Sequence, residues 1–124
     1  MVKKIEIMIY EIVSGEFNER GSFLKKGADE VIKIGRDKIN DICSRKTFNF
    51  VSREHGKLFV EERMGILIYE DTSRLGTTIL QWNRGNLQVE SRFVKGKQVA
   101  VNSGEWIMIV QDGINGLILI PFFV

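Results

Sequence analysis

Apolar and polar residues alternate in short runs along most of this chain. Near its start, Ile5, Ile7 and Ile9 occupy one side of an alternating pattern, and Glu6 occupies the other. A period of two residues is typical of a β-strand with one buried face. No stretch of ten or more residues repeats its apolar residues at the helical period of about 3.6 residues. The pattern therefore predicts an all-β protein.

Turn residues separate the apolar runs at short intervals, as in a β-sandwich or barrel. We expect the loop or loose hairpin Phe17–Glu30 and the exposed loop Asp37–Asn49, which contains one short extended piece. Pro121 cannot donate to a strand ladder, so it should lie at a sheet edge or strand end. The predicted strands are Val2–Val13, Val31–Ile34, Lys57–Glu62, Gly65–Glu70, Thr77–Trp82, Leu87–Glu90, Gln98–Val101, Glu105–Val110 and Leu117–Phe123.

The length and composition fit a single domain spanning residues 1–124. A chain of 124 residues with 44% hydrophobic and 27% charged residues is long enough for a core without disulfides or metals. It contains no internal repeat, low-complexity tract or linker. The longest apolar run, Leu117–Val124, is too short for a membrane-spanning helix, which needs about 20 residues. We therefore expect no direct insertion into a membrane.

Most polar residues of interest lie between residues 34 and 78, in the expected loops. An arginine after a strand and a glycine, such as Arg36, suits a phosphate or carboxylate. Ser52 and the backbone amides of its turn can bind an anion beside Arg53. Each motif alone is equally compatible with an ordinary solvated turn. The motifs are Ile34-Gly35-Arg36, Asn40-Asp41-Ile42, Ser52-Arg53-Glu54-His55 and Asp71-Thr72-Ser73-Arg74-Leu75-Gly76-Thr77.

Charge is concentrated in the same region. The net charge of the chain is only +2, yet residues 33–57 contain seven basic side chains and three acidic ones. Such a compact basic segment fits a small anionic ligand better than a nucleic-acid track. The aromatic residues fall mostly at strand positions, where core packing is the usual role. We therefore expect no nucleic-acid partner.

The order and spacing of these motifs resemble those of a forkhead-associated (FHA) domain, over almost the whole chain. The resemblance implies a sandwich of two antiparallel sheets with recognition loops at one end. It further implies a protein–protein interaction module of signalling that binds phosphothreonine-containing proteins or peptides. The threonine methyl group would enter a small pocket that phosphoserine leaves empty.

The same resemblance assigns roles to individual residues. Arg36 and Ser52 would bind the phosphate, and Arg53 would add a phosphate or peptide contact. Arg74 would contact the peptide or line the methyl pocket. The residues expected to brace the loops are Gly35, His55 and Gly76.

Two features depart from the family pattern. Leu75 stands where the family has an asparagine that holds the peptide main chain, and leucine cannot form that hydrogen bond. The loss of one such contact weakens binding by about 0.5–1.5 kcal/mol. Leu75 would then offer the peptide an apolar surface. Residues 82–97 are also longer than the family pattern, which indicates an added hairpin.

Leu75 keeps a second interpretation open. A degenerate FHA-fold domain would serve as a phosphate-independent interaction or assembly module, and Leu75 or an exposed edge strand would support self-association. The presence of both Arg36 and Ser52 favours the phosphate-binding interpretation.

We expect neither catalysis nor a cofactor. His55 is the single histidine, so Ser52 or Cys43 would each depend on it as a base, and no glycine-flanked nucleophile elbow is present. One histidine and one cysteine cannot form a metal-ligand cluster. Cys43 also cannot form an intrachain disulfide, and the first thirteen residues mix charges with apolar residues, unlike a signal peptide. We therefore expect a cytoplasmic protein.

Overall fold

The computed structural model describes residues 4–26, 31–61, 63–83, 85, 87–111 and 113–123. Within these residues the chain forms eleven β-strands and no helix. The strands are β1 (Lys4–Val13), β2 (Glu16–Lys26), β3 (Ile32–Gly35), β4 (Ile42–Cys43), β5 (Gly56–Glu61), β6 (Ile66–Asp71), β7 (Thr77–Asn83), β8 (Gln88–Val94), β9 (Gln98–Val101), β10 (Trp106–Gln111) and β11 (Asn115–Phe123).

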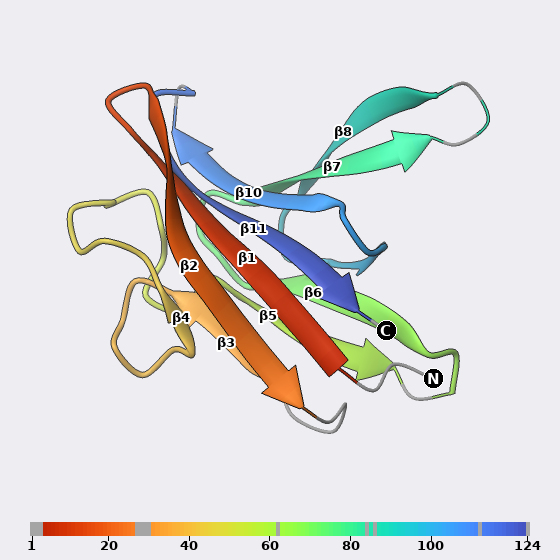
Figure 1. Cartoon of the computed structure of the whole chain (residues 1–124). Helices are drawn as coiled ribbons and strands as arrows, with labels where there is room; N and C mark the ends of the chain where they lie inside the picture. Colours follow the sequence, from red (N-terminus) through yellow and green to blue (C-terminus); the bar gives the residue numbers. More distant parts are fainter. Residues whose placement is uncertain are drawn as a thin grey trace.

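The strands form two sheets that face each other (Figure 1). One sheet has six strands in the order β2-β1-β11-β10-β7-β8, and the other has five in the order β4-β3-β5-β6-β9. Among the described strands every pairing is antiparallel except that of β3 with β4, where Ile34 lies opposite Ile42. The predicted sandwich of two antiparallel sheets is confirmed, with this one short parallel pair.

Alternation places the large aliphatic side chains between the sheets. Ile7 on β1, Leu58 on β5, Leu67 on β6 and Ile107 on β10 are fully buried in one core cluster. Burial of each such side chain contributes about 1.5–3 kcal/mol. Close packing of both sheets in this way holds the strand ends, and thus the loops between them, in fixed positions.

The loop or loose hairpin predicted over Phe17–Glu30 is, from Phe17 to Lys26, a strand, because β2 pairs with β1 along its whole length. Its polar composition reflects its place at the sheet edge, where only one side pairs and charged residues discourage further strand addition. Gly21 has a φ of +136°, and the register shifts between Ile9 and Tyr10 opposite it. This glycine therefore belongs to a β-bulge within the strand.

Residues 82–97 do contain the predicted hairpin. β8 pairs with β7 over seven residues, from Asn83 opposite Gln88 to Thr77 opposite Val94. In Figure 1 this hairpin extends to one side of the sandwich. β8 was predicted as Leu87–Glu90, but Leu87 has a φ of +56° in the turn, and the strand continues to Val94.

Pro121 lies near the end of β11, as predicted for a strand proline. Its carbonyl oxygen accepts a hydrogen bond from the Gly104 amide at 2.8 Å, so its nitrogen faces the same side. β10 begins only at Trp106, so no β10 strand residue requires the missing donor.

Some predicted segment ends, at Val2, residues 27–30 and Glu62, lie outside the described residues. Within the described part of the chain, no helix is long and apolar enough to cross a membrane.

Candidate functional site

Two loop segments lie side by side at one end of the five-stranded sheet. The Arg36 amide donates to the Ser52 carbonyl at 3.0 Å, and the Asp37 amide donates to the Arg53 carbonyl at 3.1 Å. In the reverse direction the His55 amide donates to the Ile34 carbonyl at 2.9 Å. These bonds continue the β3–β5 pairing beyond the strands, so Arg36 and Arg53 are held on adjacent backbone segments.

Gly35 occupies a position with no room for a side chain. A Cβ atom there would collide with the Arg53 carbonyl oxygen and would lie 2.7 Å from the Asn40 side-chain amide. That amide donates to the carbonyls of Asp37 and Arg53, both at 2.7 Å. Close approach of the two loops therefore depends on Gly35, and the Asn40 side chain fastens them together.

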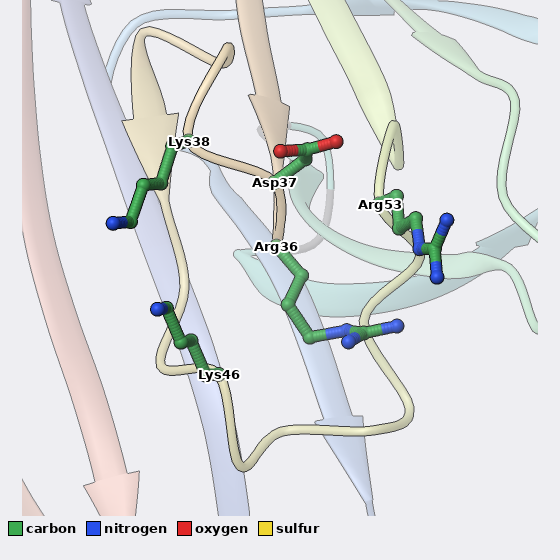
Figure 2. A pocket seen from close by; sticks show the side chains of 5 residues that line it. All are labelled: Arg36, Asp37, Lys38, Lys46 and Arg53. Carbon is green, nitrogen blue, oxygen red and sulfur yellow. The ribbon is translucent and has the colours of Figure 1, made fainter.

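An open cavity of about 320 Å³ lies between these loops and is lined by Arg36, Asp37, Lys38, Lys46 and Arg53. We call it the cationic pocket. Figure 2 shows the guanidinium groups of Arg36 and Arg53 on one side and the ammonium groups of Lys38 and Lys46 on the other. The Asp37 carboxylate points away from the Arg36 guanidinium in the same view. Four cations against one carboxylate make the pocket electropositive.

The two arginines differ in how firmly they are held. Arg36 is half-buried, and its Nε donates to the Val51 carbonyl at 3.0 Å. This bond fixes the plane of the guanidinium and leaves its terminal nitrogens toward the pocket. Arg53 is exposed.

Ser52 connects the pocket loops to the loop after β6. Its Oγ accepts a hydrogen bond from the Arg74 amide at 3.0 Å, and its amide donates to His55 Nδ1, also at 3.0 Å. Ser52 precedes the pocket residue Arg53 in the chain but is not among the residues that line the cationic pocket. The hydroxyl proton is not used in accepting from Arg74, so it is available to a ligand.

Arg74 and Leu75 lie at the exposed tip of the loop after β6, and Leu75 is 51% exposed. Leu75 also lines a second hollow of about 220 Å³, which we call the apolar hollow. Phe50 and Phe93 form part of the same wall. The hollow is lined by Phe50, Leu75, Gly76, Thr78, Phe93, Met108, Ile109, Val110 and Gln111.

His55 lies beneath both loops and is fully buried. Nδ1 accepts from the Ser52 amide, so Nε2 carries the proton and donates toward the Gly76 carbonyl at 3.0 Å, with Thr77 Oγ1 at 3.1 Å. Burial lowers the pKa of His55 below its ordinary value of 6.5, against the opposing effects of the Gly76 carbonyl and Asp71. The neutral imidazole thus joins the two loops from inside.

Asp71 is the centre of the buried polar network, which we define as His55, Tyr69, Asp71, Ser73 and Thr77. Asp71 Oδ1 accepts from Ser73 Oγ at 2.7 Å and from Thr77 Oγ1 at 2.9 Å. Its Oδ2 accepts from the Gly96 amide at 2.9 Å. Tyr69 adds a hydroxyl contact to Thr77 at 2.8 Å, and burial raises the pKa of Tyr69.

The network shapes the loop that carries Arg74 and Leu75. The Gly76 amide donates to Ser73 Oγ at 2.8 Å, which closes the turn. Gly76 has a φ of +92°, and a Cβ atom there would collide with the Phe93 ring. Both the backbone angle and the space therefore require glycine at this position.

The geometry leaves His55 without access to either proposed nucleophile. Its Nδ1 faces the Ser52 amide, and its Nε2 faces Gly76 and Thr77, so neither ring nitrogen bonds the Ser52 hydroxyl. The Cys43 thiol lies within hydrogen-bond distance of the Asp37 and Asn40 carbonyl oxygens, to which it can donate. Within the described ranges, no cluster of three His, Cys, Asp or Glu side chains is arranged to hold a metal ion.

The structure brings Arg36, Ser52, Arg53, Arg74 and Leu75 to one end of the sandwich, with Gly35, His55 and Gly76 beneath or between their loops. Asp37, Lys38 and Lys46 were not predicted as site residues. Lys38 and Lys46 were counted in the basic segment, but only the fold shows that they line the same pocket. The neighbour of Lys46 in the chain, Arg45, donates hydrogen bonds to Glu11 Oε1 on β1 at 2.8 and 3.0 Å.

No family model matches the sequence, and no curated protein matches it. Solved structures do match its fold. The N-terminal FHA domain of Rad53p from S. cerevisiae, solved with a phosphothreonine peptide, is 20% identical and has a TM-score of 0.59 over 94% of each chain. The MEK1 FHA domain is 16% identical, with a TM-score of 0.62 over 95% of this chain and 89% of that chain.

EmbR from Mycobacterium tuberculosis, solved with a low-affinity phosphopeptide, is 19% identical and has a TM-score of 0.56. The match covers 94% of this chain and 25% of EmbR. At these identities the likeness concerns the fold, and the same sandwich recurs in all three structures. This chain therefore has a forkhead-associated fold.

Proposed function

We propose that this domain binds phosphothreonine-containing segments of a partner protein and catalyses no reaction. The observation that carries the proposal is the cationic pocket, which places four cations and one carboxylate on an open surface at the loop end of the sandwich. A phosphothreonine carries a charge of about −1.5 to −2 at neutral pH. An exposed pocket with this excess of cations matches such a group.

Arg36 is the residue best prepared to bind the phosphate. The hydrogen bond from its Nε to Val51 fixes the guanidinium before any ligand arrives. The terminal nitrogens then offer charge-assisted hydrogen bonds to phosphate oxygens at a reduced entropic cost. Arg53, on the adjacent backbone segment, supplies a second positive charge.

Ser52 would bind the phosphate from the side of the neighbouring loop. Its hydroxyl accepts from the Arg74 amide, so its own proton can be donated to a phosphate oxygen. The peptide would then lie across the loop of Arg74 and Leu75. Leu75 offers no hydrogen bond, but the apolar hollow beside it would accept an apolar side chain of the peptide.

The setting that fits this proposal is phosphorylation-dependent signalling in the cytoplasm. The partner would be a phosphothreonine-containing protein. A nucleic acid fits less well, because the pocket cations lie in one compact site and do not extend along a track. The single, partly buried Cys43 agrees with a reducing compartment.

The test is binding to degenerate phosphothreonine, phosphoserine and unphosphorylated peptide libraries, measured by fluorescence anisotropy. We expect preference for phosphothreonine. Arg36→Ala should weaken that binding at least about a hundredfold, because two charge-assisted hydrogen bonds of about 1.5–3 kcal/mol each are removed. Arg36→Lys should recover only part of the affinity, because lysine keeps the charge and loses the planar fork.

The matched control is Arg63→Ala, which removes an exposed arginine from the β5–β6 turn, outside the pocket lining. It should leave affinity within about twofold, because exposed charges farther apart than the Debye length, about 8 Å at about 0.15 M ionic strength, are largely screened. Equal affinities of the wild type and Arg36→Ala for a selected phosphopeptide would reject the proposal.

A second candidate function is phosphate-independent binding by the same fold. The exposed Leu75 beside the apolar hollow favours it, because the hollow offers apolar contacts that need no phosphate. Binding of the unphosphorylated library that persists in Arg36→Ala and is lost in Leu75→Asp would support this alternative.

A further inference from the structure

The six-stranded sheet carries apolar side chains on both of its faces. One face packs on the core through residues such as Ile7 and Ile107. Side chains alternate along a strand, so the residues next to them point away from the core. We call this second surface the outer face. Its half-buried residues are Met8, Tyr10, Ile12, Leu80, Trp106, Met108 and Val110, and its exposed ones are Phe17, Trp82, Val89, Phe93 and Phe122.

Strand register makes this surface continuous. One row of paired residues crosses five strands from β1 to β8, through Tyr10, Ile118, Met108, Thr78 and Phe93. A neighbouring row joins Trp106, Leu80 and Ser91, and Trp82 lies directly opposite Val89.

The outer face forms its own packed cluster. Ile118 and Ile120 are only 1% and 8% exposed although neither belongs to the core cluster. Rings cover this side of the sheet: Tyr10 stacks on Phe17 at 4.9 Å between centroids, and Phe17 stacks on Trp106 at 6.2 Å. These contacts form a continuous apolar surface, and its removal from water on association is favourable.

The corresponding face of the five-stranded sheet is different. Lys57 and Glu70 lie opposite each other there and form an ion pair at 3.0 Å, and Gln98 bonds Glu70 at 2.6 Å. Phe59, Ile66 and Ile68 also lie on that face, but each of them is half-buried. Among the described residues, the exposed aromatic side chains are therefore concentrated on the outer face of the six-stranded sheet.

The charges and the area of the outer face decide its partner. Among described outward positions, β7, β8, β10 and β11 present no charged side chain, and Lys4, Glu6 and Glu19 lie toward the β1–β2 margin. A charged partner surface would therefore form few ion pairs with this face. Aromatic residues and methionine dominate, as in the cores of homodimer interfaces.

A second copy of the chain matches the available area. Phe17, Trp82, Phe93 and Phe122 are 51%, 46%, 63% and 45% exposed, so these four rings expose roughly 400 Å². With Val89 and the half-buried residues, the face approaches the ~800 Å² per partner of a stable interface. Two such sheets can stack face to face at about 10 Å, as sheets do within a sandwich.

We propose that the outer face of the six-stranded sheet is the interface of a homodimer with two-fold symmetry. Such an interface uses the same surface of each copy, so an uncharged face meets no like charge across the axis. The phosphate itself would bind outside this interface, because the cationic pocket is lined by residues of the opposite sheet's loops. The apolar hollow shares Thr78, Phe93, Met108 and Val110 with the outer face, so a peptide side chain in the hollow would compete with the dimer.

The test is sedimentation velocity of the full chain from micromolar to millimolar concentration. We expect the wild type to have twice the monomer mass. Val89→Arg and Ser91→Arg should each give the monomer, because a buried unpaired charge is costly in an apolar interface, and the residues opposite them are Trp82 and Leu80. Met64→Arg is the matched control, since Met64 is 73% exposed in the β5–β6 turn and should leave the dimer intact.

Tryptophan fluorescence gives a second readout. Both tryptophans of the chain, Trp82 and Trp106, lie on the outer face. Dilution of the wild type should shift their emission to longer wavelength as the dimer separates, and Val89→Arg should show the shifted spectrum at every concentration. A wild type that sediments as a monomer throughout, or arginine variants that remain dimeric, would overturn the proposal. Circular dichroism and retained phosphopeptide binding would show that the variants fold.

Discussion

The cationic pocket and the buried polar network meet at the turn from Ser52 to His55, but their residues are in opposite environments. The pocket side chains of Lys38, Lys46 and Arg53 are exposed. The network side chains are buried, and each one bonds another member or the backbone of the loops above. A residue that meets solvent can be replaced at little cost to folding, whereas a buried polar residue leaves its partners unpaired. The comparison separates affinity from stability, and each prediction below tests that separation.

The largest effect is expected for Asp71→Ala. The change leaves the Ser73 hydroxyl, the Thr77 hydroxyl and the Gly96 amide without their acceptor. We expect the free energy of unfolding to fall by about 3–5 kcal/mol, measured by urea denaturation. As a control, Asp41→Ala removes an exposed carboxylate that accepts one bond from the Lys33 amide, and it should cost about 1 kcal/mol. A loss at Asp71 no larger than this would mean that the network is not structural.

His55 should make stability depend on pH. Its pKa is lowered in the folded state, so below pH 6.5 the unfolded chain binds more protons than the folded one. Stability should therefore be complete above this value and decrease as the pH falls, with a slope that approaches about 1.4 kcal/mol per pH unit. His55 is the chain's single histidine, so His55→Asn should abolish this slope while lowering stability at neutral pH. Urea denaturation at several pH values would measure both, and an unchanged slope would contradict the assignment.

Ser52 is bonded to the network residue His55 and is also a proposed phosphate ligand. Its replacement should therefore lower both the phosphopeptide affinity and the free energy of unfolding, each modestly. Ser52→Ala removes the acceptor of the Arg74 amide and the proposed donor to the phosphate. We expect about tenfold weaker phosphopeptide binding and a stability loss of about 1 kcal/mol. Ser52→Thr keeps the hydroxyl and should recover most of the affinity. Full loss of binding with no change in stability would mean that Ser52 acts only in ligand binding and has no structural role.

The smallest effect is expected for Leu75→Asn, at the ligand side of the comparison. Leu75 is 51% exposed, so its replacement should change stability by less than about 0.5 kcal/mol. An added amide that bonds the peptide main chain should strengthen phosphopeptide binding by about 0.5–1.5 kcal/mol, measured by calorimetry. Weaker binding would indicate instead that the ligand uses the apolar surface of Leu75.

Period-two alternation is a local signal, so it predicted an all-β chain and left a sandwich or a barrel open, and the resemblance to FHA domains predicted the sandwich. The same reasoning failed at β2, where pairing with β1 and edge position outweigh a polar, glycine-containing sequence. It also ended β8 too early, because Glu90, Ser91 and Arg92 separate the apolar residues Val89 and Phe93 in this exposed edge strand. Strands that pair on one side and bury little leave only a weak pattern in the sequence.

In the candidate site, too, the residues within sequence motifs were predicted, whereas those that only the fold brings together were not. Arg36, Ser52 and His55 follow one another in a recognisable order along the chain, so their resemblance could be read directly. Lys46 lines the pocket from another loop, and its neighbour Arg45 is hydrogen-bonded to Glu11, 34 positions away in the sequence. The outer face likewise depends on register across six strands, which no single segment encodes. Long-range pairing is what the sequence pattern does not contain.

The pairing of β1 with β11 has a consequence for the newly made chain. Tyr10 pairs with Ile118, and Ile7 pairs with Pro121. The pairing of β1 with β11 therefore cannot form until β11 has been synthesised. At about 5–20 residues per second, the delay on the ribosome is roughly 5–20 s. During that time the β1–β2 hairpin can already form from local contacts, and its charged outer strand protects one edge. The other edge of β1 stays open, so this interval is when the chain is most exposed to aggregation and when a chaperone would have most effect.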